Sequence, residues 1–346
     1  MKFVKLLLLL TLGLTLGTLP AQDVHFSLYN MAPLSINPAL TGAYQGTARV
    51  GGIYRSQWSS FLAQDLFATP SFYIDAPLFR GFRKTDWIGV GMLTVNDKAG
   101  DAQLRTTINM LSLSYHMALN KTGKTMLTIG LQGGSVQRKL DLNADGVTFG
   151  DELLSGLGGG QPIQSQDRGL GESKNYLDFG IGLMLRNKMD EKSDFEIGFS
   201  YNHLTQPKYG FTTDATDPDA NKRPAKIILH GTYNSKLTEK ISIAPTFLFQ
   251  NTGGASEAVL QGWGGYQLNK AYKLNFGLGY RFGDAGQLLL GADIEENLRV
   301  AASIDVNTSS LNTATNYGGG FEIAAYYIFK IYKKPNVKPA LLCPKI

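Results

Sequence analysis

Hydrophobic and polar residues alternate along many stretches of the chain, each about ten residues long. In the clearest stretch, residues 272–283, one set of alternate positions is polar or glycine. The other set is aromatic or aliphatic: Tyr272, Leu274, Phe276, Leu278, Tyr280 and Phe282. A helical period would mix the two sets, whereas a period of two separates them. The pattern predicts a β-strand with one apolar and one polar face.

Such stretches recur about fourteen times, an even number as expected of a single-chain bacterial outer-membrane barrel. Aromatic residues gather toward both ends of the apolar faces, where the membrane interfaces of a barrel lie. Small and charged residues share the opposite faces, as in an enclosed polar lumen and unlike most soluble β-sandwiches. The stretches lie near residues 45–57, 65–76, 86–97, 103–118, 124–138, 174–187, 193–205, 225–236, 240–251, 257–268, 271–283, 286–295, 297–306 and 318–331.

The predicted fold is therefore all-β: a transmembrane antiparallel β-barrel of about 14 strands over residues 43–332, with an N-terminal plug-like segment over residues 22–42. No run of about 18 apolar residues predicts a transmembrane helix. Connections after even-numbered strands are short, such as residues 120–123 and 295–297. Those after odd-numbered strands include the two longest, residues 139–173 and 206–224. Because barrels of this kind have short periplasmic turns and long external loops, both chain ends are predicted to lie in the periplasm.

The first residues predict export. Residues 1–21 have the organisation of a signal peptide, with Lys2 and Lys5 before an apolar stretch and a cleavage site before Gln22. The single cysteine, Cys343, excludes an internal disulfide framework. It lies in a tail, residues 333–346, that is rich in proline and lysine and is interpreted as a periplasmic extension, either a disordered end or a docking segment.

Residues 22–42 are apolar but poor in predicted regular structure. Pro33 and Pro38 each lack a backbone donor and disfavour helix in the residue before them. Turn-forming residues follow at Asn37 and Gly42. Such a segment must pack against something larger, so we expect it to lie in or under the barrel lumen and to lead into the first strand.

This region resembles the PorP/SprF family of type IX secretion system membrane proteins of Bacteroidota. The resemblance rests on Phe26-Ser27-Leu28-Tyr29, Pro33-Leu34, Asn37-Pro38-Ala39-Leu40-Thr41-Gly42 and Tyr54-Arg55-Ser56-Gln57-Trp58. The chain departs from the usual family pattern at Leu28, where a polar residue is common, and at Leu40, where an aromatic residue is common.

The resemblance implies an outer-membrane barrel that works with the type IX secretion and gliding machinery and assists secretion or surface attachment of large adhesins. It implies three kinds of partner: the periplasmic ring of that system or associated lipoproteins, an adhesin-type cargo, and outer-membrane lipid. The residues predicted to fill the lumen or contact a partner are Phe26, Tyr29, Pro33, Asn37, Pro38, Gly42, Tyr54, Arg55, Gln57 and Trp58.

One predicted external loop matches the spacing of a twelve-residue calcium loop, D-x-[DN]-x-[DN]-G-x5-E. Its oxygen donors are Asp141, Asn143, Asp145 and Glu152, with Gly146 at the turn. Alternate carboxylate and amide oxygens suit Ca²⁺. Aspartate, asparagine and glycine are also common in any exposed loop, so a calcium site and an ordinary solvated loop remain the two interpretations; no other cofactor is predicted.

Catalysis and nucleic-acid binding are not indicated. Ser114 and His116 lie on the same predicted lumen face, but no Gly-x-Ser-x-Gly or His-Glu-x-x-His motif occurs. The net charge of +5 is spread along the chain, without a run of five basic residues. Charged residues on the lumen faces are expected to pair across the barrel or to line water: Arg49, Arg55, Arg281, Arg299, Asp178, Glu196, Asp293 and Asp305.

Two functions follow. The first is a non-enzymatic binding and assembly barrel whose partner-facing charges include residues 80–84 and the basic tail. The alternative is a channel or transporter for small or apolar solutes, which requires an open lumen.

Overall fold

A computed structural model describes residues 24–58, 66–79, 85–100, 102–143, 147–157, 165, 173–211, 221–295, 297–310, 312–313 and 315–331. The predicted signal peptide, the turn at residues 80–84, Asp145 and the tail with Cys343 lie outside the described residues.

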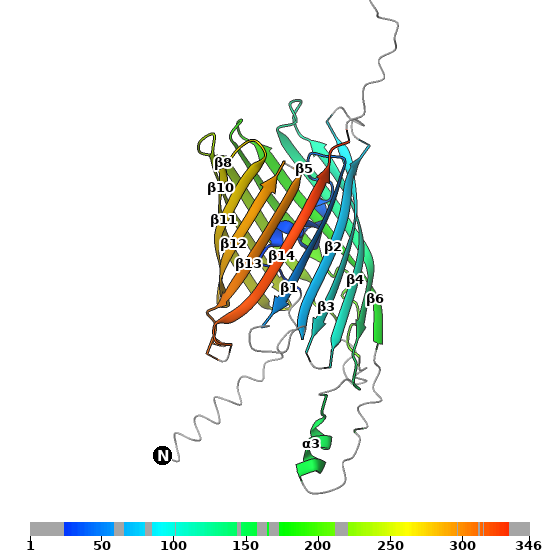
Figure 1. The fold of residues 1–346 in the computed structure, drawn as a ribbon. Coiled ribbons are helices and arrows are strands. Elements are labelled where there is room, and N and C mark those ends of the chain that lie inside the picture. Colours follow the sequence, from blue (N-terminus) through cyan, green and yellow to red (C-terminus); the bar gives the residue numbers. More distant parts are fainter. Residues whose placement is uncertain are drawn as a thin grey trace, which may run out of the picture.

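The described chain is a β-barrel that encloses a short irregular N-terminal segment (Figure 1). Three short helices precede the strands: η1 (Tyr29–Met31), α2 (Pro33–Ile36) and η2 (Pro38–Leu40). A fourth, α3 (Gly150–Leu157), lies between two strands. The strands are β1 (Ala48–Gln57), β2 (Phe67–Leu78), β3 (Trp87–Ala99), β4 (Leu104–Ala118), β5 (Thr125–Lys139), β6 (Ser173–Lys188), β7 (Ser193–Asn202), β8 (Lys226–Lys236), β9 (Ile241–Thr252), β10 (Ala255–Gln267), β11 (Tyr272–Arg281), β12 (Ala285–Ile294), β13 (Leu298–Asn307) and β14 (Gly318–Phe329).

Each strand pairs with its neighbours in sequence, and β1 closes the barrel by pairing antiparallel with β14, Ala48 opposite Phe329. Closure leaves no unpaired sheet edge, which a membrane-spanning sheet requires. The predicted fourteen-strand antiparallel barrel is confirmed, and the observed strands begin and end close to the predicted positions.

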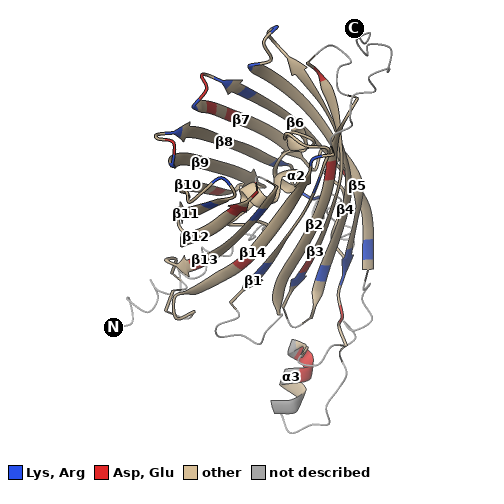
Figure 2. Ribbon diagram, turned by 45° about the horizontal axis from the view of Figure 1, so that its top comes forward, with Lys and Arg blue, Asp and Glu red and all other residues tan. Residues whose placement is uncertain are grey.

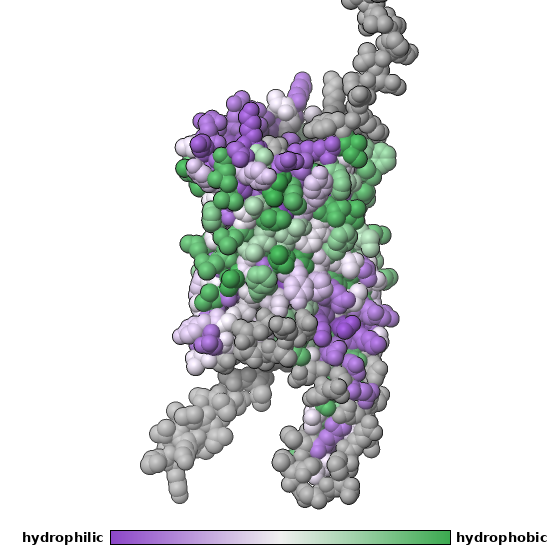
Figure 3. All heavy atoms as spheres, viewed as in Figure 1, coloured by the Kyte–Doolittle hydropathy of each residue, from purple (hydrophilic) through white to green (hydrophobic). Residues whose placement is uncertain are grey.

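The outward faces form an apolar belt between two polar ends (Figure 3). On β11, for example, Phe276 is 55% exposed and Leu278 67% exposed, although both are large and hydrophobic. An apolar surface of this extent is unfavourable in water but matches the hydrocarbon region of a bilayer. In the part of the chain that the structure describes, no helix is long and apolar enough to cross a membrane.

The two ends of the barrel differ. One end, which we call the short-turn end, carries the connections after the even-numbered strands. The β4–β5, β6–β7, β8–β9 and β10–β11 turns there are closed by side chains that accept backbone N–H groups: Asn120, Asp190, Thr238 and Asn269. The opposite end, the long-connection end, carries the β5–β6 connection with α3, at the bottom of Figure 1.

The regular pairing is interrupted once between β13 and β14. The register shifts between Ile304 and Val306, opposite Phe321 and Gly318. A bulge of this kind needs close backbone approach, and a Cβ at Gly319 would lie 2.6 Å from the Asp305 carbonyl oxygen. The bulge therefore lies beside Asp305, which points into the lumen and is 3% exposed.

The belt leads to a first prediction. Replacing Leu278 by Arg places a charge against lipid and should destabilise the barrel by about 2–4 kcal/mol if its site lies near the bilayer midplane. Denaturant unfolding in phospholipid bilayers measures this. Leu154→Arg is the matched control, since Leu154 is 70% exposed but belongs to α3, outside the strands. Equal unfolding free energies for both variants would contradict a lipid-facing β11.

Candidate functional site

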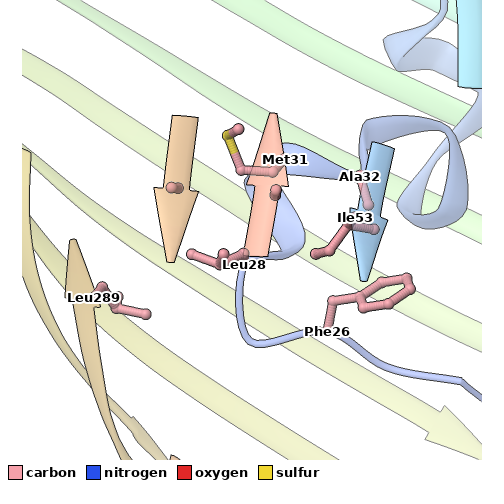
Figure 4. Packing of buried hydrophobic residues seen from close by; sticks show 8 residues of the cluster. Phe26, Leu28, Met31, Ala32, Ile53 and Leu289 are labelled. Atoms are coloured by element: carbon pink, nitrogen blue, oxygen red, sulfur yellow. The ribbon is translucent and has the colours of Figure 1, made fainter. Parts of the chain in front are cut away.

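Residues 24–43, called here the N-terminal segment, lie inside the barrel and are almost completely buried. Phe26, Leu28 and Met31 face Ile53 of β1 and Leu289 of β12 (Figure 4). Two further clusters pack Leu34 against β2–β5, and Tyr29 with Ile36 against β8–β10. The lumen is therefore less uniformly polar than the sequence predicted, because several inward positions carry aliphatic side chains that receive this segment.

Prolines determine the local shape of the segment. Pro33 and Pro38 each occupy a first helical position, where their missing N–H costs nothing, and the resulting helices are only one turn long. Asn37 ends the first helix and caps the second, since its Oδ1 accepts a hydrogen bond of 2.9 Å from the Ala39 N–H. Seven backbone N–H groups of the segment donate to carbonyl groups within it, and the barrel must supply partners for the remaining backbone groups.

Strand side chains supply those partners from around the lumen. The Glu322 carboxylate accepts hydrogen bonds from the backbone N–H groups of Ser27 and Leu28, each 2.7 Å long. Asp75 accepts one from the Gly42 N–H at 2.7 Å. The donors to segment carbonyl groups are Gln261, Gln132, Ser200, Ser114, Trp87 and Arg186. The segment and the strands thus satisfy each other's buried polar groups.

Ser27 lies at the centre of a buried charge cluster. Its hydroxyl donates to Asp305 at 2.7 Å and accepts from Arg281 at 2.7 Å. Arg55 bridges Asp305 and Glu322, and Arg281 pairs with Asp305 and Asp284, so each buried cation of the cluster has carboxylate partners. Isolated charges in such a place would be strongly unfavourable, and removing one member of a buried pair costs about 3–5 kcal/mol.

The other predicted lumen charges are paired as expected. Arg49 binds Asp75 at 2.9 Å, Arg299 binds Asp293, and Arg186 binds Glu196. Asp178 pairs with His203 at 2.5 Å. The sequence missed Glu322 and Asp75 as partners of the segment. The signal was present, because each is the only acidic residue within its strand and lies at an inward position.

Asn37 is held where three strands present glycine. Its amide nitrogen lies 3.0 Å from the Leu183 carbonyl oxygen and 3.0 Å from His230 Nε2. A Cβ at Gly182 would lie 1.9 Å from Asn37 Oδ1, and one at Gly130 would lie 2.3 Å from the Ala39 nitrogen. These inward glycines therefore allow the segment to approach the backbone of β5 and β6.

Ser114 and His116 also bind the segment. The Ser114 hydroxyl donates to the Thr41 carbonyl at 2.6 Å, and His116 Nε2 lies 2.8 Å from the same oxygen. His116 Nδ1 is 2.9 Å from Thr128 Oγ1, and the ring stacks on Trp87 with centroids 4.5 Å apart. His116 Nε2 is also 2.9 Å from the Ser114 hydroxyl, so the two side chains converge on the Thr41 carbonyl and hold the end of the segment.

The beginning of the segment lies at the long-connection end. The His25 imidazole is 3.7 Å from Glu257, near the start of β10. Val24 lines a cavity together with Ala99 and Leu104, the residues on either side of the β3–β4 connection.

The end of the segment lies at the short-turn end. Trp87, the first residue of β3, donates to the Gly42 carbonyl at 3.0 Å, and Arg186, near the end of β6, donates to that of Ala43 at 3.0 Å. The segment therefore runs along the lumen from one mouth to the other. About 20 residues rising about 2 Å each, as in a 3₁₀-helix, suffice for the roughly 30 Å of a hydrocarbon core.

This path corrects the predicted placement of the chain ends. Ile331 follows β14, and its N–H donates to Thr47 at the short-turn end. Val24 lies at the opposite end, so the two cannot both face the periplasm. The prediction rested on the parity of the short and long connections, which places the start of β1 and the end of β14 but not the start of a segment that crosses the lumen.

The structure brings together seven of the ten residues predicted to fill the lumen or bind a partner: Phe26, Tyr29, Pro33, Asn37, Pro38, Gly42 and Arg55. Tyr29 bonds Thr246. Tyr54 and Trp58 lie apart from them: Tyr54 follows the outward alternation of β1, and the Trp58 ring contacts Phe67 with centroids 4.9 Å apart. Gln57 is half-buried at the end of β1.

The calcium interpretation stays a prediction, because Asp145 lies outside the described residues. Asp141 Oδ1 accepts the Asn143 N–H at 3.1 Å, as in an ordinary turn. Glu152 lies on α3 and accepts the backbone N–H groups of Phe149 at 3.1 Å and Ser165 at 2.9 Å. Within the described ranges, no group of three His, Cys, Asp or Glu side chains is arranged to hold a metal ion.

A closed fourteen-strand barrel with an apolar belt and a polar lumen defines an outer-membrane-type barrel protein. Over residues 18–327 the sequence matches the family described as "Type IX secretion system membrane protein PorP/SprF", and the chain belongs to that family. The resemblance inferred from the sequence is thereby confirmed, and the outer membrane is the location that family and fold support.

Solved structures share the fold. The Ralstonia pickettii toluene transporter TbuX aligns with a TM-score of 0.51 and 9% identity, over 86% of this chain and 94% of that chain. The deltaS2 mutant of the TodX monoaromatic hydrocarbon channel aligns with a TM-score of 0.50 and 11% identity, over 87% and 94%. At such identities the likeness concerns the fold alone. Among curated protein sequences, no match to this chain is found.

A second prediction follows from the inward glycines. Gly182→Val should displace the N-terminal segment, because the added atoms overlap Asn37, while the outward face of β6 is unchanged. We expect amide hydrogen exchange in residues 24–43 to become at least about 10-fold faster. Gly262→Val is the control, since a Cβ there meets nothing within 4 Å. Unchanged protection in the Gly182 variant would contradict the close contact.

Proposed function

We propose that this chain is a non-enzymatic outer-membrane barrel of the type IX secretion and gliding machinery that assists secretion or surface attachment of a large adhesin-type cargo through protein–protein contacts. Membership in the PorP/SprF family supports the machinery. The observation that favours a binding role over a transport role is the N-terminal segment, which occupies the lumen and is held by buried hydrogen bonds to strands around the barrel.

A partner surface is suggested by lysines at the short-turn end (Figure 2). Four successive turns, from β4–β5 to β10–β11, each carry two lysines at or beside the turn. None of these lysines forms an ion pair in the described part of the chain, and they are Lys121, Lys124, Lys188, Lys192, Lys236, Lys240, Lys270 and Lys273. Unpaired surface charges of one sign attract surfaces of the opposite sign.

The acidic residues in these turns are fewer and partly occupied. Asp190 accepts the backbone N–H groups of Lys192 and Ser193, each at 2.7 Å. These hydrogen bonds, that of Lys192 first, lower the pKa of Asp190, so it stays ionised as a turn cap. The excess positive charge remains and suits an acidic surface of a periplasmic partner, such as the secretion ring or an associated lipoprotein. The turn at residues 80–84 and the tail, which the sequence favoured for this role, lie outside the described residues.

A third prediction tests this role. Replacing Lys188, Lys192 and Lys236 by Glu should lower co-purification of periplasmic type IX components from native outer membranes by about 10-fold or more, because like charges across an interface are repulsive. The matched control replaces Lys98, Lys139 and Lys174 at the long-connection end with the same change in charge. Equal recovery from both variants would contradict a partner at the short-turn end.

The alternative function is a channel or transporter for small or apolar solutes. It is favoured by two cavities, of about 680 and 800 Å³, one toward each mouth of the barrel. The segment lies between them and contributes to the walls of both.

A fourth prediction separates the two functions. The purified protein in planar bilayers should show little steady conductance, because the segment closes the passage between the cavities. The Gly182→Val variant should conduct more than wild type, and the Gly262→Val variant should not. A large steady conductance of the wild-type protein would favour the channel.

A further inference from the structure

We propose that the cavity at the long-connection end is a binding site for a small apolar monocarboxylate, and that Arg138 binds its carboxylate. This site goes beyond the proposed function, since it requires neither transport nor a secretion partner.

The cavity has the size and walls of a ligand pocket. Its volume of about 680 Å³ lies within the range of small-molecule sites. One wall is formed by inward-facing residues of β3 and β4 together with the start of the segment: Phe26, Leu93, Val95, Ile108 and Met110. Leu93, Val95 and Met110 pack against Leu34 of the segment on one side and border the cavity on the other, so they offer a surface for an apolar ligand body.

Arg138 borders the same cavity on the inward face of β5. Its guanidinium carbon lies 4.8 Å from the Tyr209 ring centroid and 5.2 Å from that of Phe211. One nitrogen donates to the Tyr209 carbonyl at 2.8 Å. These contacts fix the orientation of the guanidinium, and neither of them brings a carboxylate to it.

Arg138 differs from the other lumen arginines in this respect. Among the described residues, no carboxylate pairs with it. Each of the others has an acidic partner: Arg49, Arg55, Arg186, Arg223, Arg281 and Arg299. A half-buried arginine without an acidic partner is unfavourable unless an anion or water compensates it.

The acidic residues of the cavity are already engaged elsewhere. Asp178 is bound by His203 at 2.5 Å and lies 3.9 Å from Arg223. Asp97 accepts a hydrogen bond from Thr69 at 2.7 Å. Within the described residues, the Arg138 guanidinium therefore has its charge available for the carboxylate of a ligand.

The geometry also selects the ligand class. A guanidinium offers two parallel N–H groups that match a carboxylate. Lys222, Arg223 and Lys226 also line the cavity but have contacts of their own, so Arg138 offers a place for one negative charge. The apolar wall suits an aliphatic or aromatic body and disfavours a sugar or a zwitterion.

Calorimetry on the whole protein in a neutral detergent tests the site. The probes are octanoate and 1-naphthoate, which separate an aliphatic from an aromatic body, and their methyl esters as uncharged counterparts. We expect saturable binding of at least one acid, about 10-fold or more tighter than its ester, because charge-assisted hydrogen bonds to the carboxylate are lost in the ester.

Variants assign the binding to Arg138. Arg138→Gln should weaken the acid about 10-fold, to the level of the ester, and Arg138→Lys should retain part of the affinity. Arg105→Gln is the matched control. Arg105 of β4 pairs with Lys139, the residue after Arg138, and is exposed on the outward face of the barrel.

The proposal is overturned if neither acid binds saturably, if acid and ester bind equally, or if Arg138→Gln binds as tightly as wild type. If the glutamine variant does not fold, the lysine variant and the comparison of acid with ester in the wild-type protein still decide. Loss of partner co-purification in the lysine variants of the short-turn end would not bear on this result, so the two proposals fail independently.

Discussion

The structure depends on one constraint: a chain segment that proline keeps from regular structure cannot be buried unless other groups satisfy its backbone. In this barrel the strands do so. Glu322 and Asp75 accept N–H groups near the two ends of the N-terminal segment, and polar side chains of several strands donate to its carbonyl groups. The lumen is therefore matched to one specific occupant, which differs from a generic polar channel.

The same constraint explains features that look unrelated in the sequence. Glycine occupies the inward positions of β5 and β6 where Asn37 and Pro38 approach the strand backbone. Aliphatic residues occupy the inward positions that contact Leu28, Leu34 and Ile36. Buried charges are tolerated because they are paired and also bind the segment, as at Ser27. The inward positions that contact the segment are thus small, apolar or charged according to the part of the segment that they face.

The sequence could predict those parts of the fold and of the lumen site that depend on patterns among neighbouring residues. The alternation in β11, where Leu278 and Phe276 share a face, needs only neighbouring residues, so the strands and the barrel were predictable. The inward orientation of the charged residues could also be predicted, since Arg55 and Asp305 alternate with apolar residues along their strands. The partners of these charged residues could not be predicted. Glu322, for example, is 295 positions from Ser27, and only the pairing of β14 with β1 brings the two together.

The path of the segment and the isolation of Arg138 were beyond local patterns for the same reason. Pro33 and Pro38 show that the segment is irregular, but the direction in which it crosses the lumen is set by contacts with distant strands. Likewise Arg138 has the same residue type as its paired neighbours. Only the positions of the described acidic side chains, taken together, distinguish it from the paired arginines.

A segment that crosses the whole lumen also constrains the order of assembly. The side chains that hold Ser27 come from β1, β11, β13 and β14, and β1 and β14 pair where the two ends of the sheet meet. If the cylinder closed first, the free end of the chain would have to be drawn past the buried charges from one mouth to the other. If the segment is laid against β13 and β14 before β1 meets them, no threading is needed. The arrangement favours a barrel that closes around its own N-terminal segment, so that β1 pairs with β14 after the segment is already in place.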